Sequence, residues 1–432
     1  MKHILKRSLL AMSCSAIFFL TACNDSNDDY VGVTPSQTFI SEKNYVFDKS
    51  LAEAASIKVM TYNMVNVKGK TAKATAMVLF PTVAQPKDGY RVVVWEHGTL
   101  GVADDCAPTN NILGTNFKDP LAKSLLAAGY VIVAPDYEGM GVPGIHPYLH
   151  LESEAKSAIA AVKAAQDHYG NVLNKQWMSA GQSQGGQASL GTAQYANADL
   201  NYKGAVAGAP ASSLDKIIFD VAPPALLAAE NKELAAGATL AYRAENGSIG
   251  AYATLLSYAA FAAVGIKASD SGFDYREIFN DVRSQNIAAL AEGTNGDNGL
   301  CLSSSDPINH PEDSLRYRFT KDIVAFLTEN PTKRLLDYPG LNKDKFYASA
   351  QIQKFLKESQ PATVKIDKPI LIIQGTADMS VPYPVTEAMY KAMLAQGTNV
   401  KFLPVLDATH TQAIVKKNPE LVAFIQQYMP AS

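Results

Sequence analysis

The stretch Gly-Gln-Ser-Gln-Gly-Gly at residues 181–186 decides the fold. Residues 175–180 before it predict a short buried strand, and the Ala- and Gln-rich residues 187–198 after it predict a helix. Gly-x-Ser-x-Gly on a strand-to-helix turn is typical of a nucleophile elbow, a turn so tight that only small residues fit on either side of the serine. The alternative is a glycine-rich helix start without chemistry. The elbow interpretation puts Ser183 at the end of a sheet strand, beside the free N–H groups of a helix N-terminus.

Strands and helices alternate on both sides of this turn. Apolar segments predict core strands at 90–95, 131–135, 204–208, 368–374 and 400–405, and residues 151–165 show the helical period. Residues 56–67 and 70–81 predict a hairpin. The alternation predicts an α/β fold with a mostly parallel sheet, helices on both faces and an antiparallel hairpin at its start.

A long helical segment interrupts the alternation at about 212–348, and we interpret it as a cap inserted into the sheet domain. Within it, residues 246–266 contain no charged side chain, so a membrane span is the alternative interpretation. Their Ser, Thr, Tyr and Gly content is only weakly hydrophobic, which favours a buried cap helix.

A serine hydroxyl needs a base, and proteins with this elbow supply an acid and then a histidine later in the chain. Only two histidines follow Ser183: His310, inside the cap, and His410, after the last predicted strand. The loop after that strand returns over the elbow, so we expect His410 to be the base. Asp378 follows the preceding strand directly and is the expected acid. Asp407 is the rival, but it lies too near His410 in sequence to reach the ring from behind.

Two backbone N–H groups should stabilise the oxyanion. One belongs to Gln184, the residue after the nucleophile, and the other to the loop His97-Gly98-Thr99. We expect the Thr99 N–H to be the second donor, with Leu100 as the alternative. His97 precedes the serine in the chain, so a structural role is expected for it.

Composition excludes several classes of function. The chain has 432 residues, of which 47% are hydrophobic and 18% are charged, with a formal net charge of -3. This is globular composition with no basic footprint for nucleic acid. The sequence contains neither a phosphate-binding nor a dinucleotide-binding glycine motif, and neither Cys-x-x-Cys nor His-Glu-x-x-His, so no cofactor or metal is expected.

The first 23 residues have the pattern of an export signal: a basic start, a short apolar run at 9–20 and small residues before Cys23. The ending resembles a bacterial lipobox, which implies cleavage before Cys23 and its lipidation; a plain secretory signal is the alternative. Asn rather than Asp follows Cys23, which favours the outer membrane of a bacterial envelope. Residues 24–48 are then a tether, and 49–432 form one domain that includes the cap. Cys106 and Cys301 are expected to pair in an oxidising compartment, the alternative being two free thiols.

Five motifs resemble the secretory lipase family of α/β-hydrolases, which includes fungal lipase A and exported bacterial esterases. They lie at 96–101, 134–141, 146–149, 181–186 and 375–382. The resemblance covers most of 56–432 and implies a lipase or esterase that cleaves acyl esters, including triacylglycerol, under a helical cap. The cap itself matches nothing that narrows the substrate, and lipase and carboxylesterase are equally favoured. A serine peptidase or amidase on the same fold and a non-catalytic surface protein are the alternatives.

Overall fold

The computed structural model describes residues 38–432. The predicted signal at 1–23, the lipidation site Cys23 and the first part of the predicted tether lie outside the described residues.

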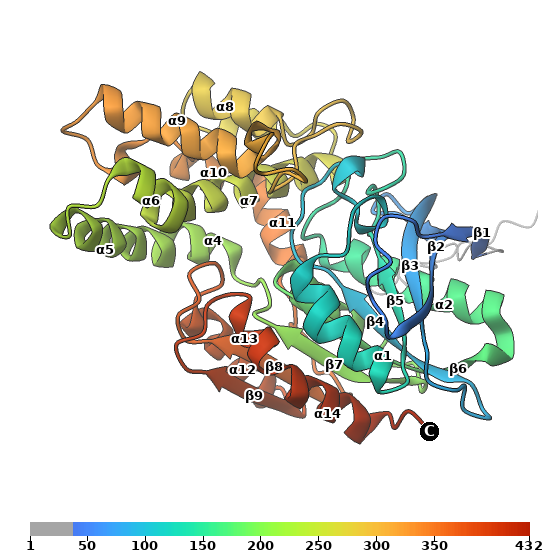
Figure 1. The fold of residues 1–432 in the computed structure, drawn as a ribbon. Helices are drawn as coiled ribbons and strands as arrows, with labels where there is room; N and C mark the ends of the chain where they lie inside the picture. Colours follow the sequence, from blue (N-terminus) through green and yellow to red (C-terminus); the bar gives the residue numbers. More distant parts are fainter. Residues whose placement is uncertain (1–37) are drawn as a thin grey trace, which may run out of the picture. The chain divides into compact units, whose positions relative to one another are not determined.

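A nine-stranded sheet in the order β1-β2-β3-β5-β4-β6-β7-β8-β9 forms the framework (Figure 1). The first three strands and β5 pair in antiparallel fashion, and all pairs from β5 through β4 to β9 are parallel. The strands are β1 (Phe39–Asn44), β2 (Ala54–Val65), β3 (Thr71–Pro81), β4 (Tyr90–Glu96), β5 (Val131–Pro135), β6 (Leu173–Gln182), β7 (Tyr202–Gly208), β8 (Ile370–Gly375) and β9 (Val400–Val405). The predicted α/β architecture is therefore confirmed, with the hairpin β2–β3 at its start.

Side chains on successive positions of the central strands enter two different cores. In β4, Val92 and Val94 pack on one face, whereas Val93 and Trp95 pack on the other. Burial on both faces explains why these strands are continuous apolar runs in the sequence. The first face is covered by α2 (Leu151–Tyr169), α3 (Gln184–Tyr195) and α12 (Tyr383–Ala395), and the second by α1 (Lys123–Ala127), α13 (Gln412–Lys416) and α14 (Asn418–Tyr428).

The sheet begins earlier than the sequence suggested, because part of the predicted tether at 24–48 is strand β1. Phe39 stacks on the His168 ring at 3.7 Å between centroids, and Tyr45 is buried. These aromatic contacts fix the segment against the sheet domain. Any tether therefore ends before Phe39.

Between β7 and β8 the chain forms the cap, and its helices lie together on one side of the sheet domain, green to orange in Figure 1. They are α4 (Leu214–Lys216), α5 (Ala222–Ala235), α6 (Leu240–Asn246), α7 (Ser248–Ser269), α8 (Val282–Ala289), α9 (Leu315–Glu329), α10 (Lys343–Ala348) and α11 (Ala350–Glu358). Ile352 and Phe355 of α11 belong to the cap core, so the insertion continues ten residues beyond its predicted end at 348.

The uncharged segment singled out in the sequence is helix α7. It is long and apolar enough to cross a membrane, but 67% of its most apolar window is buried inside the protein. Buried residues along its length form the centre of the cap core, including Ile249, Phe261 and Val264. At Gly265 the helix lies against the backbone of Tyr148, so closely that an added Cβ would be 2.6 Å from the Tyr148 carbonyl oxygen. The cap and the loop before α2 are thus in direct backbone contact.

Candidate active site

Ser183 occupies the turn between β6 and α3 in a strained backbone conformation, with φ 63° and ψ -118°. Such a conformation costs a non-glycine residue roughly 1–3 kcal/mol, so the surroundings must enforce it. They do so through close packing: a Cβ on Gly181 would lie 2.1 Å from the Gly185 carbonyl oxygen, and one on Gly185 would lie 1.8 Å from that of Glu96. Only glycine fits at these two positions. The geometry is that of a nucleophile elbow.

Three side chains from separate loops meet at this turn. His410 Nε2 lies 2.7 Å from Ser183 Oγ, and His410 Nδ1 lies 2.8 Å from Asp378 Oδ2. Ser183 is 8% exposed and Asp378 is 4% exposed. The structure thus brings together the serine, acid and histidine that the sequence singled out, in hydrogen-bonded order.

The Asp378 carboxylate is fixed by further donors. Its Oδ1 accepts hydrogen bonds from the backbone N–H groups of Ser380 (2.8 Å) and Val381 (2.9 Å). Its Oδ2 also accepts from the Gln374 side chain at 3.0 Å. These contacts hold the carboxylate so that one oxygen faces the imidazole. Fixing the ring and its tautomer is what such an acid does in a triad.

The rival residues lie elsewhere. Asp407 is exposed, and His310 is on the cap surface, 3.4 Å from Glu312. His97 is buried below the site, with Nδ1 2.7 Å from the Gly98 carbonyl oxygen. Burial lowers the pKa of His97. None of the three side chains makes a hydrogen bond to Ser183 within residues 38–432.

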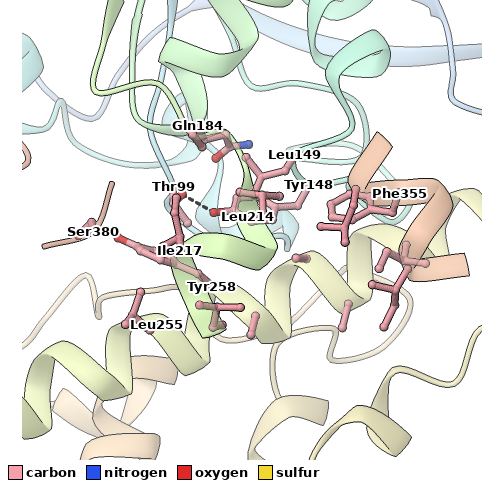
Figure 2. Close-up of a pocket in the computed structure, with 18 of the residues that line it drawn as sticks. Thr99, Tyr148, Leu149, Gln184, Leu214, Ile217, Leu255, Tyr258, Phe355 and Ser380 are labelled. Atoms are coloured by element: carbon pink, nitrogen blue, oxygen red, sulfur yellow. Dashed lines mark hydrogen bonds between the residues drawn. The ribbon is translucent and has the colours of Figure 1, made fainter. Parts of the chain in front are cut away.

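Two backbone groups border the serine where an oxyanion would form. Gln184 is the first residue of α3, and the first N–H groups of a helix have no partner within it. Thr99 lies on the other side, and its N–H has no acceptor among the residues that the structure describes. The Thr99 hydroxyl is 2.6 Å from the buried hydroxyl of Tyr148, a bond that Figure 2 shows. This bond fixes the loop that would supply the second donor.

A buried carboxyl group, which no pattern in the sequence indicated, contacts residues on both sides of the expected oxyanion site, next to Gln184 and next to Tyr148. Glu154 of α2 is fully buried, and its Oε1 accepts from the Gln184 side chain at 2.8 Å and from the Leu149 N–H at 2.9 Å. Leu149 has a positive φ of 59°, which is unfavourable for leucine and needs such support. It follows Tyr148 directly. Glu154 therefore connects the Gln184 side of the site to the Thr99 side.

The protonation states around Glu154 follow from its burial. Burial raises the pKa of Glu154 to about 8, although the hydrogen bonds from Gln184 and Leu149 oppose the shift. Burial also lowers the pKa of the neighbouring His146 to about 3, so its ring is neutral. Its Nδ1 donates to the Glu138 carbonyl oxygen at 2.8 Å, which leaves Nε2 to accept from Gln184 at 3.1 Å. Both hydrogens of the Gln184 amide are thereby used.

An apolar cavity opens from Ser183 into the cap, with a volume of about 90 Å³. Figure 2 shows side chains from the cap helices and from the loops of the sheet domain converging on it. Its aliphatic and aromatic lining includes Leu214, Ile217, Leu255, Ala263, Ile266, Phe346, Ile352 and Phe355. The polar residues of its lining are few: Thr99, Tyr148, Ser183, Gln184, Tyr258 and Ser380. The cavity, named the acyl cavity below, therefore suits an apolar group.

A second and wider depression, the disulfide cleft, also reaches Ser183 and has a volume of about 880 Å³. Cys106 and Cys301 form a disulfide in its wall, as predicted, across a sequence separation of 195 residues. His410 lines this cleft and does not line the acyl cavity. Within residues 38–432 no cluster of three or more His, Cys, Asp or Glu side chains is arranged to hold a metal.

Comparison with solved structures shows the fold. Candida antarctica lipase A in its closed state has a TM-score of 0.64 and 18% identity, over 93% of this chain and 85% of that chain. The rice cell wall degrading esterase LipA from Xanthomonas oryzae has a TM-score of 0.60 and 17% identity, over 91% and 98%. Likeness at this identity establishes the α/β-hydrolase fold, as predicted, and not an activity.

Sequence comparison adds less. The model of the Prolyl oligopeptidase family matches residues 317–431, which include Asp378 and His410 but not Ser183. No curated protein matches the chain.

Proposed function

We propose that this protein is a serine hydrolase that cleaves carboxylic acyl esters through an acyl-enzyme intermediate. The observation that carries the proposal is the hydrogen-bonded chain from Ser183 to His410 to Asp378 at the mouth of an apolar cavity. A serine hydroxyl is a weak nucleophile until a positioned base removes its proton, and this geometry supplies the base.

In the proposed mechanism Ser183 Oγ attacks the ester carbonyl while His410 Nε2 takes its proton. The backbone N–H groups of Gln184 and Thr99 stabilise the oxyanion, and Asp378 stabilises the imidazolium that forms. His410 then protonates the leaving alcohol, and the acid remains as an ester of Ser183. Water activated by His410 releases it in a second, equivalent cycle.

The acyl cavity supports an apolar acyl group as the acid part of the substrate. Its walls are aliphatic and aromatic, so each buried methylene gains about 0.8 kcal/mol. We expect kcat/KM for p-nitrophenyl esters to rise from acetate to octanoate. A series extended to palmitate and to emulsified triacylglycerol distinguishes a lipase from a carboxylesterase.

Ser183→Ala tests the proposal directly. The variant should keep its folded structure and lose at least about a thousandfold in kcat/KM on p-nitrophenyl octanoate. A fluorophosphonate probe should label the wild type at Ser183 and leave the variant unlabelled. Full turnover by Ser183→Ala, or a wild type that neither reacts with the probe nor cleaves any ester, would contradict the proposal.

The match to the Prolyl oligopeptidase family favours a peptidase as the second candidate. The same three residues would serve amide cleavage, so the triad does not separate the two. The apolar lining of the acyl cavity favours esters, because it offers no carboxylate for a peptide amino terminus. Parallel assays of aminoacyl p-nitroanilides and of p-nitrophenyl esters with the same acyl groups decide between them: enzyme-dependent cleavage of the anilides that is lost in Ser183→Ala would favour the peptidase, and cleavage of the esters alone would favour the esterase.

We also propose that the protein is exported and anchored by lipid on Cys23, at the bacterial outer membrane. The Cys106–Cys301 disulfide supports an oxidising compartment, and the lipobox-like sequence supports the anchor. Metabolic labelling with an alkyne fatty acid, followed by membrane fractionation, should mark the wild type in the outer membrane and not Cys23→Ser. Equal labelling of both would argue against the anchor.

A further inference from the structure

Thr99 brings a side-chain hydroxyl to the nucleophile, in addition to the backbone N–H proposed above as an oxyanion donor. Thr99 is half-buried and lines both the acyl cavity and the disulfide cleft, as Ser183 does. The residue before it, Gly98, is so near the elbow that a Cβ added to it would lie 3.6 Å from the Ser183 Cβ. The N–H and the hydroxyl of one residue therefore both lie near the position of a reacting carbonyl.

The partner of the Thr99 hydroxyl is the hydroxyl of Tyr148, at an oxygen-to-oxygen distance of 2.6 Å (Figure 2). Tyr148 is 2% exposed, and within residues 38–432 its hydroxyl makes no other hydrogen bond. If this phenol accepted the bond, its own hydrogen would be buried without an acceptor, which is costly. The Tyr148 hydroxyl is therefore the donor, and the Thr99 oxygen is the acceptor.

This assignment leaves the hydrogen of the Thr99 hydroxyl available to a ligand. The Thr99 side chain makes no second hydrogen bond in the described part of the chain, and the space beside it belongs to the acyl cavity and the disulfide cleft. Burial raises the pKa of Tyr148 well above its ordinary value of 10, so the phenol keeps its proton. A hydroxyl that accepts from another hydroxyl is also a stronger donor, because hydrogen bonds in a chain polarise one another.

Tyr148 is held in place by the cap. Its ring packs edge to face against Phe261 of α7, with 5.9 Å between the ring centroids, and its backbone lies against Gly265 of the same helix. Its N–H donates to the His146 carbonyl oxygen at 2.9 Å. The phenol, and with it the Thr99 hydroxyl, is thus oriented before any substrate binds. Donors oriented in advance need no reorganisation when charge develops on the substrate.

We propose that the Thr99 hydroxyl is a third oxyanion donor and that Tyr148 is a positioning residue that orients and polarises it. The inference rests on the proposed ester hydrolysis and adds to its transition state. As Ser183 Oγ bonds to the carbonyl carbon, the carbonyl π electrons move to the oxygen, which receives the N–H groups of Gln184 and Thr99 and the Thr99 O–H. No proton is transferred to this oxygen. The three bonds weaken when the carbonyl re-forms and the alcohol leaves.

Thr99→Val isolates the side chain, because valine has the shape of threonine and keeps the backbone N–H. We expect kcat/KM on p-nitrophenyl octanoate to fall about 10- to 100-fold. Thr99→Ser keeps the hydroxyl and should stay within about threefold of wild type. Thr254→Val is the matched control: it removes a hydroxyl of α7 that bonds the Gly250 carbonyl oxygen outside the acyl cavity and the disulfide cleft, and it should leave kcat/KM unchanged.

Two ketones with one carbon skeleton separate oxyanion stabilisation from packing. The carbonyl of 1,1,1-trifluoro-2-decanone adds Ser183 to form a hemiketal with an anionic oxygen, whereas 2-decanone binds without forming this adduct. In Thr99→Val the Ki of the trifluoromethyl ketone should rise by the same factor as kcat/KM falls, and the Ki of 2-decanone should change less than about twofold. A purely structural role of Thr99 would weaken both ketones equally.

Tyr148→Phe keeps the ring and removes the donor, and it provides an independent test if Thr99→Val does not fold. We expect about a threefold to tenfold loss of kcat/KM, with the same selective rise in the Ki of the trifluoromethyl ketone. Because the phenol acts through Thr99, the double variant Thr99→Val/Tyr148→Phe should lose no more than Thr99→Val alone.

Four results would overturn the proposal: Thr99→Val within threefold of wild type, Thr99→Ser as impaired as Thr99→Val, equal weakening of both ketones, or additive losses in the double variant. Each of them leaves the proposed function intact, because the wild type still releases octanoate through Ser183. A wild type that cleaves no ester would instead remove the proposed function itself.

Discussion

Replacing Glu154 with glutamine should make the pH dependence of stability shallower and reverse the order of stability between variant and wild type. Glutamine keeps the acceptor that Gln184 and Leu149 use, and it stays neutral at every pH. Glu154 also stays neutral up to its folded pKa of about 8, well above its ordinary value of 4.5. Both side chains are therefore neutral in acid, and only glutamate acquires a charge in alkali.

The magnitude follows from the pKa difference. Between pH 4.5 and 8 the unfolded chain releases this proton while the folded protein retains it, so the free energy of unfolding falls as the pH rises. The stability is fully present below pH 4.5 and is lost as the pH passes 8. At about 1.4 kcal/mol per pH unit, the total loss for wild type is about 5 kcal/mol.

Glutamine has its own cost, because Glu154 Oε2 is buried without a partner and an amide NH2 placed there would be unsatisfied. That cost is about 1–3 kcal/mol and does not depend on pH. Glu154→Gln should therefore be about 1–3 kcal/mol less stable than wild type at pH 4.5 and about 2–4 kcal/mol more stable at pH 9.

Urea unfolding at pH 4.5, 7 and 9, followed by tryptophan fluorescence, measures the difference. Other buried acids titrate in both proteins, so they cancel. Glu152→Gln is the matched control: it lies on the same helix, is partly exposed and pairs with Lys156, and its difference from wild type should change little with pH. A Glu154→Gln difference that stays constant across the three pH values would show that Glu154 is ionised in the folded protein and refute the reasoning.

Three other predictions concern the elbow, the triad and the disulfide. Gly185→Ala places a Cβ 1.8 Å from a carbonyl oxygen of β4, and we expect little soluble protein and no esterase activity; normal yield and rate would contradict the packing argument. Asp378→Asn should lower kcat on p-nitrophenyl octanoate by about 10⁴-fold with KM little changed, because an amide holds His410 in the wrong tautomer; a loss below tenfold would mean that another acid orients the ring. Cys106→Ser/Cys301→Ser should lower the free energy of unfolding by about 5 kcal/mol, since the bond closes a loop of 195 residues; an unchanged urea midpoint under oxidising conditions would show that the bond does not form.

The sequence predicted the sheet and the meeting of Ser183, Asp378 and His410 because both depend on local patterns in a fixed chain order. Continuous apolar runs mark strands buried on both faces, and the loops after them must lie at one edge of a parallel sheet. Asp378 follows such a run directly, and His410 follows β9, an edge strand of which only the two end residues are buried. Their convergence on Ser183 is therefore a consequence of topology, which a sequence can reveal.

Contacts that depend on packing between distant segments were not predictable in this way. Glu154 is one acidic residue of an amphipathic helix, and nothing in its local pattern distinguishes a buried glutamate from an exposed one. Helix α11 has the composition of a surface helix, yet Phe355 reaches the cap core and the acyl cavity. Strand β1 is short and polar, and its pairing is determined by Phe39 and its stacking on α2.

The contact between Gly265 and Tyr148 limits how the cap can move. Helix α7 touches the Tyr148 backbone, and the Tyr148 hydroxyl is bonded to Thr99. A rigid swing of the whole cap about its connections would pull on the loop that bears Thr99, the proposed second oxyanion donor. We therefore expect any motion of the cap that admits a substrate to leave α7 in place and to involve cap segments that do not touch Tyr148. In this view α7 is the fixed part of the cap, and any opening forms between other segments of the cap.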